Sequence, residues 1–532
     1  MDRRLILVND VGTTGVRAVI FDGRAEALVE EYEEIEQVYP RPGWTEQDPE
    51  LLFELCVEVS RRAMDRLGIT PGGLSAMGIA TQRATSLIWD GETGKPFYNA
   101  ITWQDTRMAD FCSGVNRSPL FRLLHGLGGL YRGLALLSPA LRRPMLGKLL
   151  ITAANFRVTP AQSSAHARWI LDNVPEAREA EARGKALFGT LDTWLLWKYT
   201  GGKVHATDYS NVSATGMFDP FGMRWSPLLL RPFRLPGRLR LPEIRETSGD
   251  FGHTEVFGEP VPIRCVVADQ QAALFAEACF HPGDVKCTNG TGTFIDMNTG
   301  EEPMASTHHL TPMIAWRVGG RTTYMLEGFV SSSGASVQWL RDNLGIISDL
   351  SESEEMACRA GDCGGVYVVP AFTGLTAPYW DPYARGTVIG LTRSTTREQV
   401  VRATLESIAY QCRDVVEAME RDSGVKVTKI IADGGASRND FLLQFMADIM
   451  DVRVERPGML EATALGAAYL AGLASGVWDS LEEVAKTRKI ERVFTPTMSE
   501  ERRQSLYRGW KKAVERACHW GEESATGGRS AV

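Results

Sequence analysis

The chain opens on two apolar runs with a glycine turn between them. Leu5 to Val8 and Ala18 to Phe21 are rich in aliphatic and β-branched residues, and Gly12-Thr13-Thr14-Gly15 separates them. Short apolar runs on either side of such a turn predict a β-hairpin. Apolar residues at helical spacing then predict a helix over Pro49 to Leu67, and Ala76 to Ala80 predicts a buried strand. Strands and helices alternate in this way through most of the chain, which predicts an α/β fold.

The same strand–turn–strand pattern recurs in the second half of the chain. Val285 to Thr288 and Phe294 to Met297 flank the turn Asn289-Gly290-Thr291-Gly292-Thr293. The two units lie roughly half a chain apart, and such an internal repeat is typical of a duplicated domain. We therefore predict two domains of similar size in the 532 residues, over residues 1–276 and 277–532.

A third glycine turn follows another apolar run. Ile430 to Ala432 leads into Asp433-Gly434-Gly435-Ala436, and Asn439 precedes an apolar-striped segment over residues 441–450. This order predicts a strand, a turn and a helix, and the glycines allow close approach of a flat or anionic ligand. Asn439 offers both a donor and an acceptor at the start of the helix.

A capping pattern predicts the start of a long core helix. Thr395-Thr396-Arg397-Glu398 places a threonine three residues before a glutamate, which is the spacing of a capping box. Apolar residues then follow helical spacing from Val400 to Met419. We expect this helix to serve the core.

Residues 111–171 differ from the rest of the chain in charge. They contain seven arginines and Lys148 but no aspartate or glutamate, amid many leucines and glycines. One interpretation is a basic amphipathic surface that contacts a membrane surface or an anionic partner. The other, which we favour, is a helical insertion whose basic face meets acidic regions of the same protein or is solvated.

The overall composition argues against several classes of protein. Apolar residues make up 44% and charged residues 23%, the balance of a globular protein with substantial cores. A net charge of -8 argues against nucleic acid as a partner, because nucleic-acid-binding surfaces are basic. No stretch approaches the roughly 18 apolar residues of a membrane span. The nine cysteines form no CxxC pair, which predicts reduced thiols, and the N-terminus lacks the features of a signal peptide, so we expect a cytoplasmic protein.

The first glycine turn carries the residue types of a phosphate site. Backbone N–H groups and the hydroxyls of Thr13 and Thr14 can point at phosphate oxygens, and Asp10 at the strand end can hold a hydrated Mg²⁺. The turn is neither a Walker A loop nor a GxGxxG fingerprint. The turn around Thr291 offers similar groups from the other half. A plain turn is the alternative for each, but three such turns in one α/β chain favour nucleotide binding.

Another apolar strand, over residues 266–268, ends in Asp269 and Gln270. A carboxylate there can accept the proton of an attacking hydroxyl, as kinase catalysis requires, and an amide can hold other hydroxyls of the substrate. The alternative for Asp269 is a helix cap, and the two roles are compatible. Arg83 and Trp103 offer a guanidinium fork and an indole face for a polyol, with ordinary packing as the alternative.

The motifs together are recognisable. They include DVGTTGVRAVIFD, TQRAT, NAITWQDTRMAD, ADQQAALF, GTGTFIDMNTG, PAFTGLTAPYWDPYARGTVIGLTR and DGGASRNDFLLQFMADI. Through them the chain resembles the glycerol kinases of the FGGY family of carbohydrate kinases over nearly its whole length. The resemblance implies an α/β fold of two ribonuclease-H-like, actin-type ATPase domains flanking a nucleotide and substrate cleft. It also implies ATP and Mg²⁺, and transfer of the γ-phosphoryl group to a hydroxyl.

The resemblance also implies roles for the matching residues. Asp269 is expected to be the general base, Gln270 a polyol contact, and Arg83 and Trp103 the lining of the polyol pocket. Asp10 is expected to serve the metal. The residues expected to bind the nucleotide, by its phosphates or by the rest of its surface, are Thr13, Thr14, Arg17, Thr291, Gly334, Gln338, Gly435 and Asn439.

Three positions depart from the glycerol kinase pattern. Ala84 replaces a glutamate that contacts glycerol, Ala161 falls near the position of the pocket tyrosine, and Val11 stands where a glutamine is usual. Losing a carboxylate and a phenol hydroxyl removes hydrogen bonds of roughly 0.5–1.5 kcal/mol each and enlarges the pocket. The chain thus resembles a divergent branch of the glycerol kinases.

From these observations we predict an ATP-dependent kinase that phosphorylates a primary hydroxyl of glycerol or a related small polyol. Two alternatives stay open: a pentulose or other sugar kinase of the same family, and a nucleotide-binding regulatory protein without turnover. The substrate, allosteric control and the formation of a homo-oligomer are not determined by these patterns.

Overall fold

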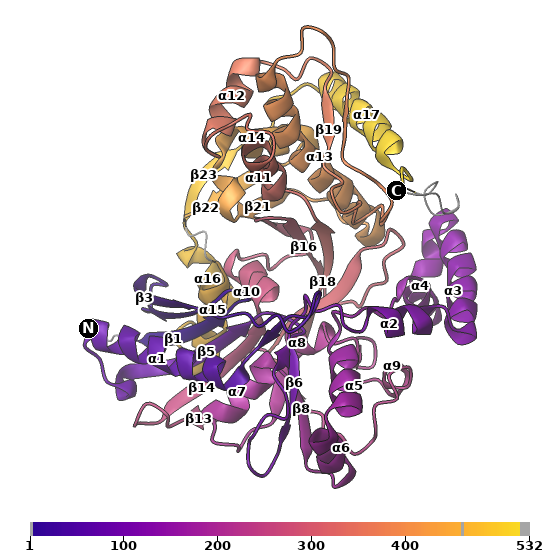
Figure 1. The fold of residues 1–532 in the computed structure, drawn as a ribbon. Helices are drawn as coiled ribbons and strands as arrows, with labels where there is room; N and C mark the ends of the chain where they lie inside the picture. The colour runs from indigo at the N-terminus through magenta and orange to yellow at the C-terminus, as the bar shows by residue number, and fades with distance from the viewer. Residues whose placement is uncertain (1–3, 459–461, 522–532) are drawn as a thin grey trace.

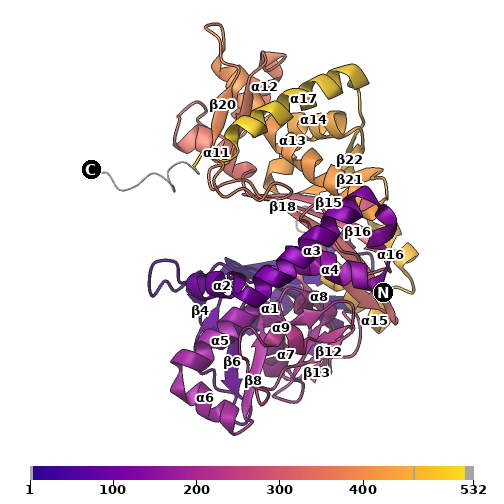
Figure 2. The ribbon, with the colours of Figure 1, turned by 90° about the vertical axis from the view of Figure 1, so that its right-hand side faces the viewer.

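The computed structural model describes residues 4–458 and 462–521, which form two lobes (Figures 1 and 2). Each lobe is built around one large mixed sheet. The N-terminal lobe contains the sheet of six strands in the order β13 (His253–Thr254), β14 (Val261–Ala268), β5 (Leu74–Thr81), β1 (Leu5–Val11), β2 (Gly15–Phe21) and β3 (Ala27–Glu34). β1, β2 and β3 are successively antiparallel, whereas β1, β5 and β14 are parallel. The predicted first hairpin is therefore confirmed.

The C-terminal lobe repeats this arrangement. Its seven strands follow the order β17 (Thr311–Val318), β18 (Arg321–Val330), β16 (Thr293–Gly300), β15 (Asp284–Asn289), β21 (Lys429–Asp433), β22 (Arg453–Pro457) and β23 (Ile490–Phe494). The order β3-β2-β1-β5-β14 recurs as β18-β16-β15-β21-β22, with the same strand directions. The predicted internal repeat and the predicted α/β fold are thus both present.

The long helices begin at capping residues. α1 (Pro49–Leu67) has the predicted bounds, and the Asp48 side chain accepts hydrogen bonds from the N–H groups of Glu50 and Leu51. α13 (Arg397–Ser423) has a capping box made by Thr396 and Gln399, one residue later than predicted. Thr395 is not the cap, because its hydroxyl accepts a hydrogen bond from Thr392 N–H in the preceding turn.

Two helices join the lobes. α10 (Asp269–Ala276) follows β14, and α15 (Ala462–Ser475) comes from the second half of the chain but packs on β1, β5 and β14. A Cβ atom on Gly466 of α15 would lie 1.8 Å from the carbonyl oxygen of Ala272 of α10, so only glycine permits this approach. The second half thus contributes to the core of the N-terminal lobe, and the division at 276/277 stays a prediction.

A smaller sheet and further helices complete the N-terminal lobe. The sheet has the strand order β4 (Glu46–Gln47), β7 (Ala100–Ile101), β6 (Ser86–Asp90) and β8 (Ala186–Thr190). Two short strand pairs are β9 (Ala206–Asp208) with β12 (Glu243–Arg245) and β10 (Phe218–Asp219) with β11 (Arg224–Trp225). The other helices outside the insertion are α6 (Pro175–Ala182), α7 (Leu191–Tyr199), α8 (Tyr209–Ser213) and α9 (Pro227–Leu230).

The second half of the chain forms further helices. Besides α13 and α15, they are α11 (Gly334–Asp342), α12 (Glu352–Ala360), α14 (Asp440–Met450), α16 (Leu481–Thr487) and α17 (Glu500–Ala517). One further strand pair is β19 (Tyr367–Val369) with β20 (Thr387–Ile389). In the described ranges, no helix is long and apolar enough to cross a membrane.

The acid-free segment is helical, as predicted. It forms α2 (Ala109–Asn116), α3 (Pro119–Leu137), α4 (Met145–Asn155) and most of α5 (Ser163–Asn173). α3 and α4 pack together as a hairpin that projects from the side of the molecule (Figure 1). The hairpin also reaches the C-terminal lobe, where Asn155 donates a hydrogen bond to the carbonyl of Ser306 and Lys148 lies 3.5 Å from Glu302.

Candidate active site

The strands of the N-terminal sheet bring Asp10 and Asp269 to one edge. Asp10 of β1 is in register with Ala80 of β5, and Ala80 is in register with Val267 of β14. Asp269 follows Val267 by two residues and opens α10. Because β1, β5 and β14 are parallel, both carboxylates lie at the carboxyl ends of the strands, where open α/β sheets bind their ligands.

Asp269 combines a helix-terminal position with a perturbed acidity. Its Oδ1 accepts a hydrogen bond of 2.7 Å from the backbone N–H of Gln270, and its side chain stays 27% exposed. Burial raises the pKa of Asp269 above the usual value of an aspartate, while the positive charge of Arg83 opposes this rise. A carboxylate with a raised pKa is a stronger proton acceptor once ionised, so the side chain suits a general base. Asp269 therefore combines a hydrogen bond at the start of α10 with a raised pKa, so the two roles considered for it are compatible.

Arg83 extends from the end of β5 to the C-terminal lobe. Its Nη2 lies 2.7 Å from Oε2 of Glu327, its Nε lies 3.8 Å from Oδ1 of Asp269, and its Nη1 lies 3.2 Å from Sδ of Met313. Burial lowers the pKa of Arg83, but the carboxylates of Glu327 and Asp269 outweigh burial and raise it above its usual value. The guanidinium therefore stays charged beside the predicted base.

A buried lysine contacts Gln270, the residue after Asp269. Lys286 of β15 donates a hydrogen bond of 2.7 Å to Oε1 of Gln270 and lies 2.9 Å from Oδ2 of Asp296. The side chains of Lys286 and Asp296 are both fully buried. Burial lowers the pKa of Lys286, but Asp296 and Asp433 outweigh burial and raise the pKa above its usual value. The ammonium group thus fixes the amide orientation of Gln270.

Two carboxylates face each other beneath this lysine. Asp296 of β16 and Glu327 of β18 are direct partners in the antiparallel register. Like charges in that position destabilise a sheet unless cations compensate, and Lys286 and Arg83 are those cations. Sequence analysis missed Lys286, Asp296 and Glu327. A signal was present, because Asp296 stands inside the apolar run Phe294 to Met297 and a charge in a buried strand requires a partner.

The first glycine turn lies beside Trp103. The indole Nε1–H of Trp103 lies 3.1 Å from Oγ1 of Thr13, whose hydroxyl donates to Oε1 of Gln82 at 3.2 Å. Thr14 is exposed at the tip of the turn. Arg17 lies further along β2 and forms an ion pair of 2.8 Å with Glu30 of β3. Among the predicted site residues, the structure therefore places Trp103 in contact with Thr13 and Arg83 close to Asp269.

Each of the first two glycine turns is closed by a backbone hydrogen bond, and the second turn is one residue shorter than the first. Gly12 N–H donates to Gly15 O at 3.0 Å, and Gly290 N–H donates to Gly292 O at 2.9 Å. The start of α11 lies on this second turn, since Gly334 N–H donates to Gly290 O at 3.0 Å. Thr291 is exposed at the turn, and Gln338 is exposed one helical turn beyond Gly334.

The third turn packs against the second hairpin. A Cβ atom on Gly434, whose φ is +84°, would lie 2.6 Å from the carbonyl oxygen of Asn289, so the turn requires glycine. Space is open around Gly435, where an added Cβ would meet no atom within 4 Å. Asn439 caps α14, because its side-chain oxygen accepts the N–H of Leu442 at 2.9 Å.

Two of the departures from the glycerol kinase pattern are neighbours in space. The hydroxyl of Ser163 donates a hydrogen bond of 2.8 Å to the carbonyl oxygen of Ala84. Ala161 lies two residues before Ser163, in the turn that leads into α5. Ala84, which follows Arg83 in the chain, and Ala161 therefore lie in the same part of the N-terminal lobe.

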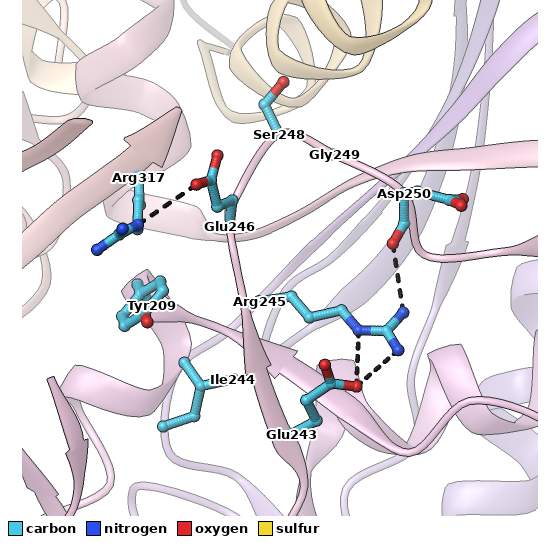
Figure 3. Close-up of a pocket in the computed structure, with 9 residues that line it drawn as sticks. All are labelled: Tyr209, Glu243, Ile244, Arg245, Glu246, Ser248, Gly249, Asp250 and Arg317. Atoms are coloured by element: carbon cyan, nitrogen blue, oxygen red, sulfur yellow. Dashed lines mark hydrogen bonds and ion pairs between the residues drawn. The ribbon is translucent and has the colours of Figure 1, made fainter. Parts of the chain in front are cut away.

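A hollow of about 450 Å³ lies elsewhere on the surface (Figure 3). Figure 3 shows two ion pairs among its charged residues, Arg245 with Glu243 and Arg317 with Glu246. The two nitrogen–oxygen distances are 2.6 Å and 3.4 Å. None of the predicted site residues lines it. We therefore assign the site to the strand edges around Asp269 and not to this hollow.

The donor set at the strand edge fits a magnesium–nucleotide complex. Mg²⁺ prefers one or two carboxylates, with phosphate oxygens and water in the other positions. Asp10 and Asp269 lie at one edge, and Thr13 and Thr14 of the first turn follow Asp10 by three and four residues. The residues present thus match the chemistry that sequence analysis predicted for the metal and the phosphates.

Repeated lobes, glycine turns and carboxylates at the strand ends are typical of ATP-dependent carbohydrate kinases. Models of the FGGY family of carbohydrate kinases match the chain in two parts: the N-terminal domain over residues 5–121 and 140–276, and the C-terminal domain over residues 285–475. The chain belongs to the FGGY family of carbohydrate kinases.

Curated relatives match over nearly the full length. A glycerol kinase of Caldanaerobacter subterraneus subsp. tengcongensis is 48% identical over 98% of this chain and all of its own length. Glycerol kinase 2 of Thermotoga maritima is 47% identical over 97% of this chain and 99% of its own. Among solved structures, a Plasmodium falciparum glycerol kinase with ADP has a TM-score of 0.87 and 31% identity, covering 97% of this chain and 98% of its own.

Proposed function

We propose that the protein transfers the γ-phosphoryl group of ATP to a primary hydroxyl of glycerol, giving glycerol 3-phosphate. The observation that carries the proposal is the 48% identity, over 98% of this chain, to a protein named glycerol kinase. The position of Asp269 at the start of α10, 3.8 Å from Arg83, supports it, because phosphoryl transfer to an alcohol needs a group that accepts the hydroxyl proton. A cytoplasmic location, with ATP at hand and the thiols reduced, is part of the proposal.

The acceptor alcohol is held and deprotonated by residues around α10. Asp269 takes the hydroxyl proton as the oxygen attacks phosphorus. Gln270 offers its amide N–H groups to another hydroxyl, because its Oε1 already accepts from Lys286. Arg83 donates to polyol oxygens from the opposite side, and the exposed indole of Trp103 covers the carbon skeleton beside Thr13.

The nucleotide is held by the three glycine turns. Asp10 would hold Mg²⁺, which would neutralise charge on the phosphates. The phosphates are contacted from the two hairpins, by Thr13 and Thr14 of the first turn, Arg17 of β2 and Thr291 of the second turn. The rest of the nucleotide lies against the surface formed by Gly334, Gln338, Gly435 and Asn439.

Ala84 and Ala161 determine how selective the pocket is. Both remove a polar group from the side next to Arg83, so glycerol makes fewer hydrogen bonds and the pocket accepts bulk there. We therefore expect turnover of glycerol with a weakened preference over polyols that carry one more carbon.

ADP release measured at saturating Mg-ATP tests the proposal. The panel contains glycerol, dihydroxyacetone, erythritol and xylulose, with parent enzyme, Asp269→Asn, and the exposed control Asp349→Asn. We expect turnover with glycerol and a loss of roughly 10²–10⁴-fold in Asp269→Asn alone. Faster turnover of xylulose than glycerol would make the protein a pentulose kinase. ATP binding by calorimetry without turnover on any acceptor would make it a regulatory protein.

A further inference from the structure

The outer side of α3 carries a continuous row of exposed leucines. They are spaced alternately by three and four residues, so they lie along one side of the helix. Each is between 49% and 85% exposed. We call this row the leucine face: Leu120, Leu123, Leu127, Leu130, Leu134 and Leu137.

The leucine face is not needed to hold the hairpin in place. The opposite side of α3 makes the internal contacts: a Cβ on Gly128 would lie 2.5 Å from the carbonyl oxygen of Leu150 on α4, and Ala135 packs with Ile151 and Ala305. α4 adds exposed apolar residues of its own, since Met145, Leu146 and Leu149 are 44% to 68% exposed. Figure 2 shows α3 and α4 together on the side of the molecule that faces the viewer. The leucine face and the exposed apolar residues of α4 therefore form an exposed apolar patch, and such patches mark interaction surfaces.

The kinase fold does not account for this patch. The family model of the N-terminal domain leaves out residues 122–139, which comprise most of α3. None of the predicted catalytic or binding residues lies on α3 or α4. Most of the leucine face therefore lies outside the part of the chain that the family model matches.

Charge around the leucine face indicates an anionic partner. Residues 111–171 contain seven arginines and one lysine but no acidic residue. Arg117 and Arg122 are exposed at the start of α3, and Arg143 is exposed where the chain turns between α3 and α4. Apolar side chains flanked by exposed arginines are typical of helices that lie in the headgroup region of an anionic bilayer.

Charge argues against a second copy of this chain. Pairing of two leucine faces would bring together two segments that carry eight cations and no acid each.

We propose that the α3–α4 hairpin docks the enzyme on a lipid bilayer that carries anionic headgroups. The leucine face and the apolar residues of α4 enter the interface, and Arg117, Arg122 and Arg143 contact the phosphates of the headgroups. Docking of this kind is peripheral and reversible, and it leaves the kinase site free, because Asp269 and the glycine turns lie on other elements.

Vesicle co-sedimentation of the full chain tests the proposal. The probes are phosphatidylcholine vesicles with and without phosphatidylglycerol, at low and high salt. We expect binding to the anionic vesicles that weakens with salt, and weak binding to the neutral ones. Leu127→Ser with Leu130→Ser should lower the partition coefficient about tenfold or more. Leu391→Ser, at a position that is 58% exposed in the other lobe, is the control.

A second variant separates charge from apolar contact. Arg122→Ser with Arg143→Ser should reduce binding to anionic vesicles and leave binding to neutral ones unchanged. Kinase turnover should be unchanged in every variant, which shows that each is folded. Absence of vesicle binding, or binding that the leucine substitutions do not alter, overturns the proposal. So does a dimer in analytical ultracentrifugation that the leucine substitutions abolish, since the leucine face would then join two copies.

Discussion

Lys286 donates a hydrogen bond from Nζ to Oε1 of Gln270 over 2.7 Å, and this contact connects the C-terminal sheet to the residue after Asp269. The same ammonium group lies 2.9 Å from Asp296. A fully buried lysine thus compensates a buried carboxylate and at the same time orients a side chain of the proposed substrate site. We therefore expect both catalysis and the stability of the lobe contact to depend on this one charge.

The pH dependence of kcat/KM should report the acidity of Asp269. Turnover needs the ionised carboxylate, so kcat/KM falls as pH decreases through its pKa. Because burial raises this pKa, the acid limb lies above the range of an ordinary aspartate. Lys286 lowers the pKa, so Lys286→Met should move the acid limb to higher pH. Lys203→Met, at an exposed site, is the control. Superimposable acid limbs for parent and Lys286→Met would refute the electrostatic role.

Lys286 and Asp296 should also behave as a coupled pair in unfolding. Lys286→Met leaves the carboxylate of Asp296 buried without its cation, and we expect a loss of about 3–5 kcal/mol in the free energy of unfolding. Lys286→Met with Asp296→Leu removes both charges and should recover most of that loss. The KM for glycerol should stay raised in the double variant, because Gln270 is no longer oriented. Urea titration and initial rates measure both effects. A double variant as unstable as the single one would contradict the pairing.

Glycine substitutions should separate structure from nucleotide binding. A Cβ on Gly334 would lie 2.6 Å from the carbonyl oxygen of Gly290, so Gly334→Ala should cost about 1–3 kcal/mol and raise the KM for ATP. Gly435→Ala meets no atom within 4 Å, so it should raise the KM for ATP without changing Tm. Gly237→Ala is also unobstructed and lies outside the site, and should change neither. An unaltered KM in Gly435→Ala would place the nucleotide elsewhere.

Stability should depend on pH through Glu277. Burial raises the pKa of this carboxyl to about 8, from an ordinary value of 4.5, although Arg488 lies 3.0 Å away. Between these values the folded protein holds a proton that the unfolded chain has lost, so stability falls as pH rises, by up to about 1.4 kcal/mol per pH unit. Glu277→Gln should flatten this slope between pH 5 and 8, and the exposed substitution Glu301→Gln should not. Urea titrations across the pH range measure it, and equal slopes would show that the folded pKa is not raised.

Local patterns predicted the elements well where short-range chemistry decides them. The helix over Pro49 to Leu67 has its predicted bounds, since Asp48 caps one end and Gly68 terminates the other. The capping box of α13 was predicted one residue early, because two adjacent threonines each fit the pattern. Which of the two threonines caps the helix depends on the turn at Thr392, and the spacing of apolar residues along the helix contains no information about that turn.

The sequence by itself determined the repeat of strand, glycine turn and strand, the carboxylates at the strand ends and the family, because all of these are carried by residues close together along the chain. Only the tertiary structure decided which charges meet. Lys286, Asp296, Glu327 and Arg83 come from four strands or strand ends and lie up to 244 residues apart, and only the packing of two sheets pairs them. The tertiary structure also decided that the leucines of α3 face outward. The sequence pattern of a leucine stripe on a helix is the same whether the stripe packs in the core or faces solvent.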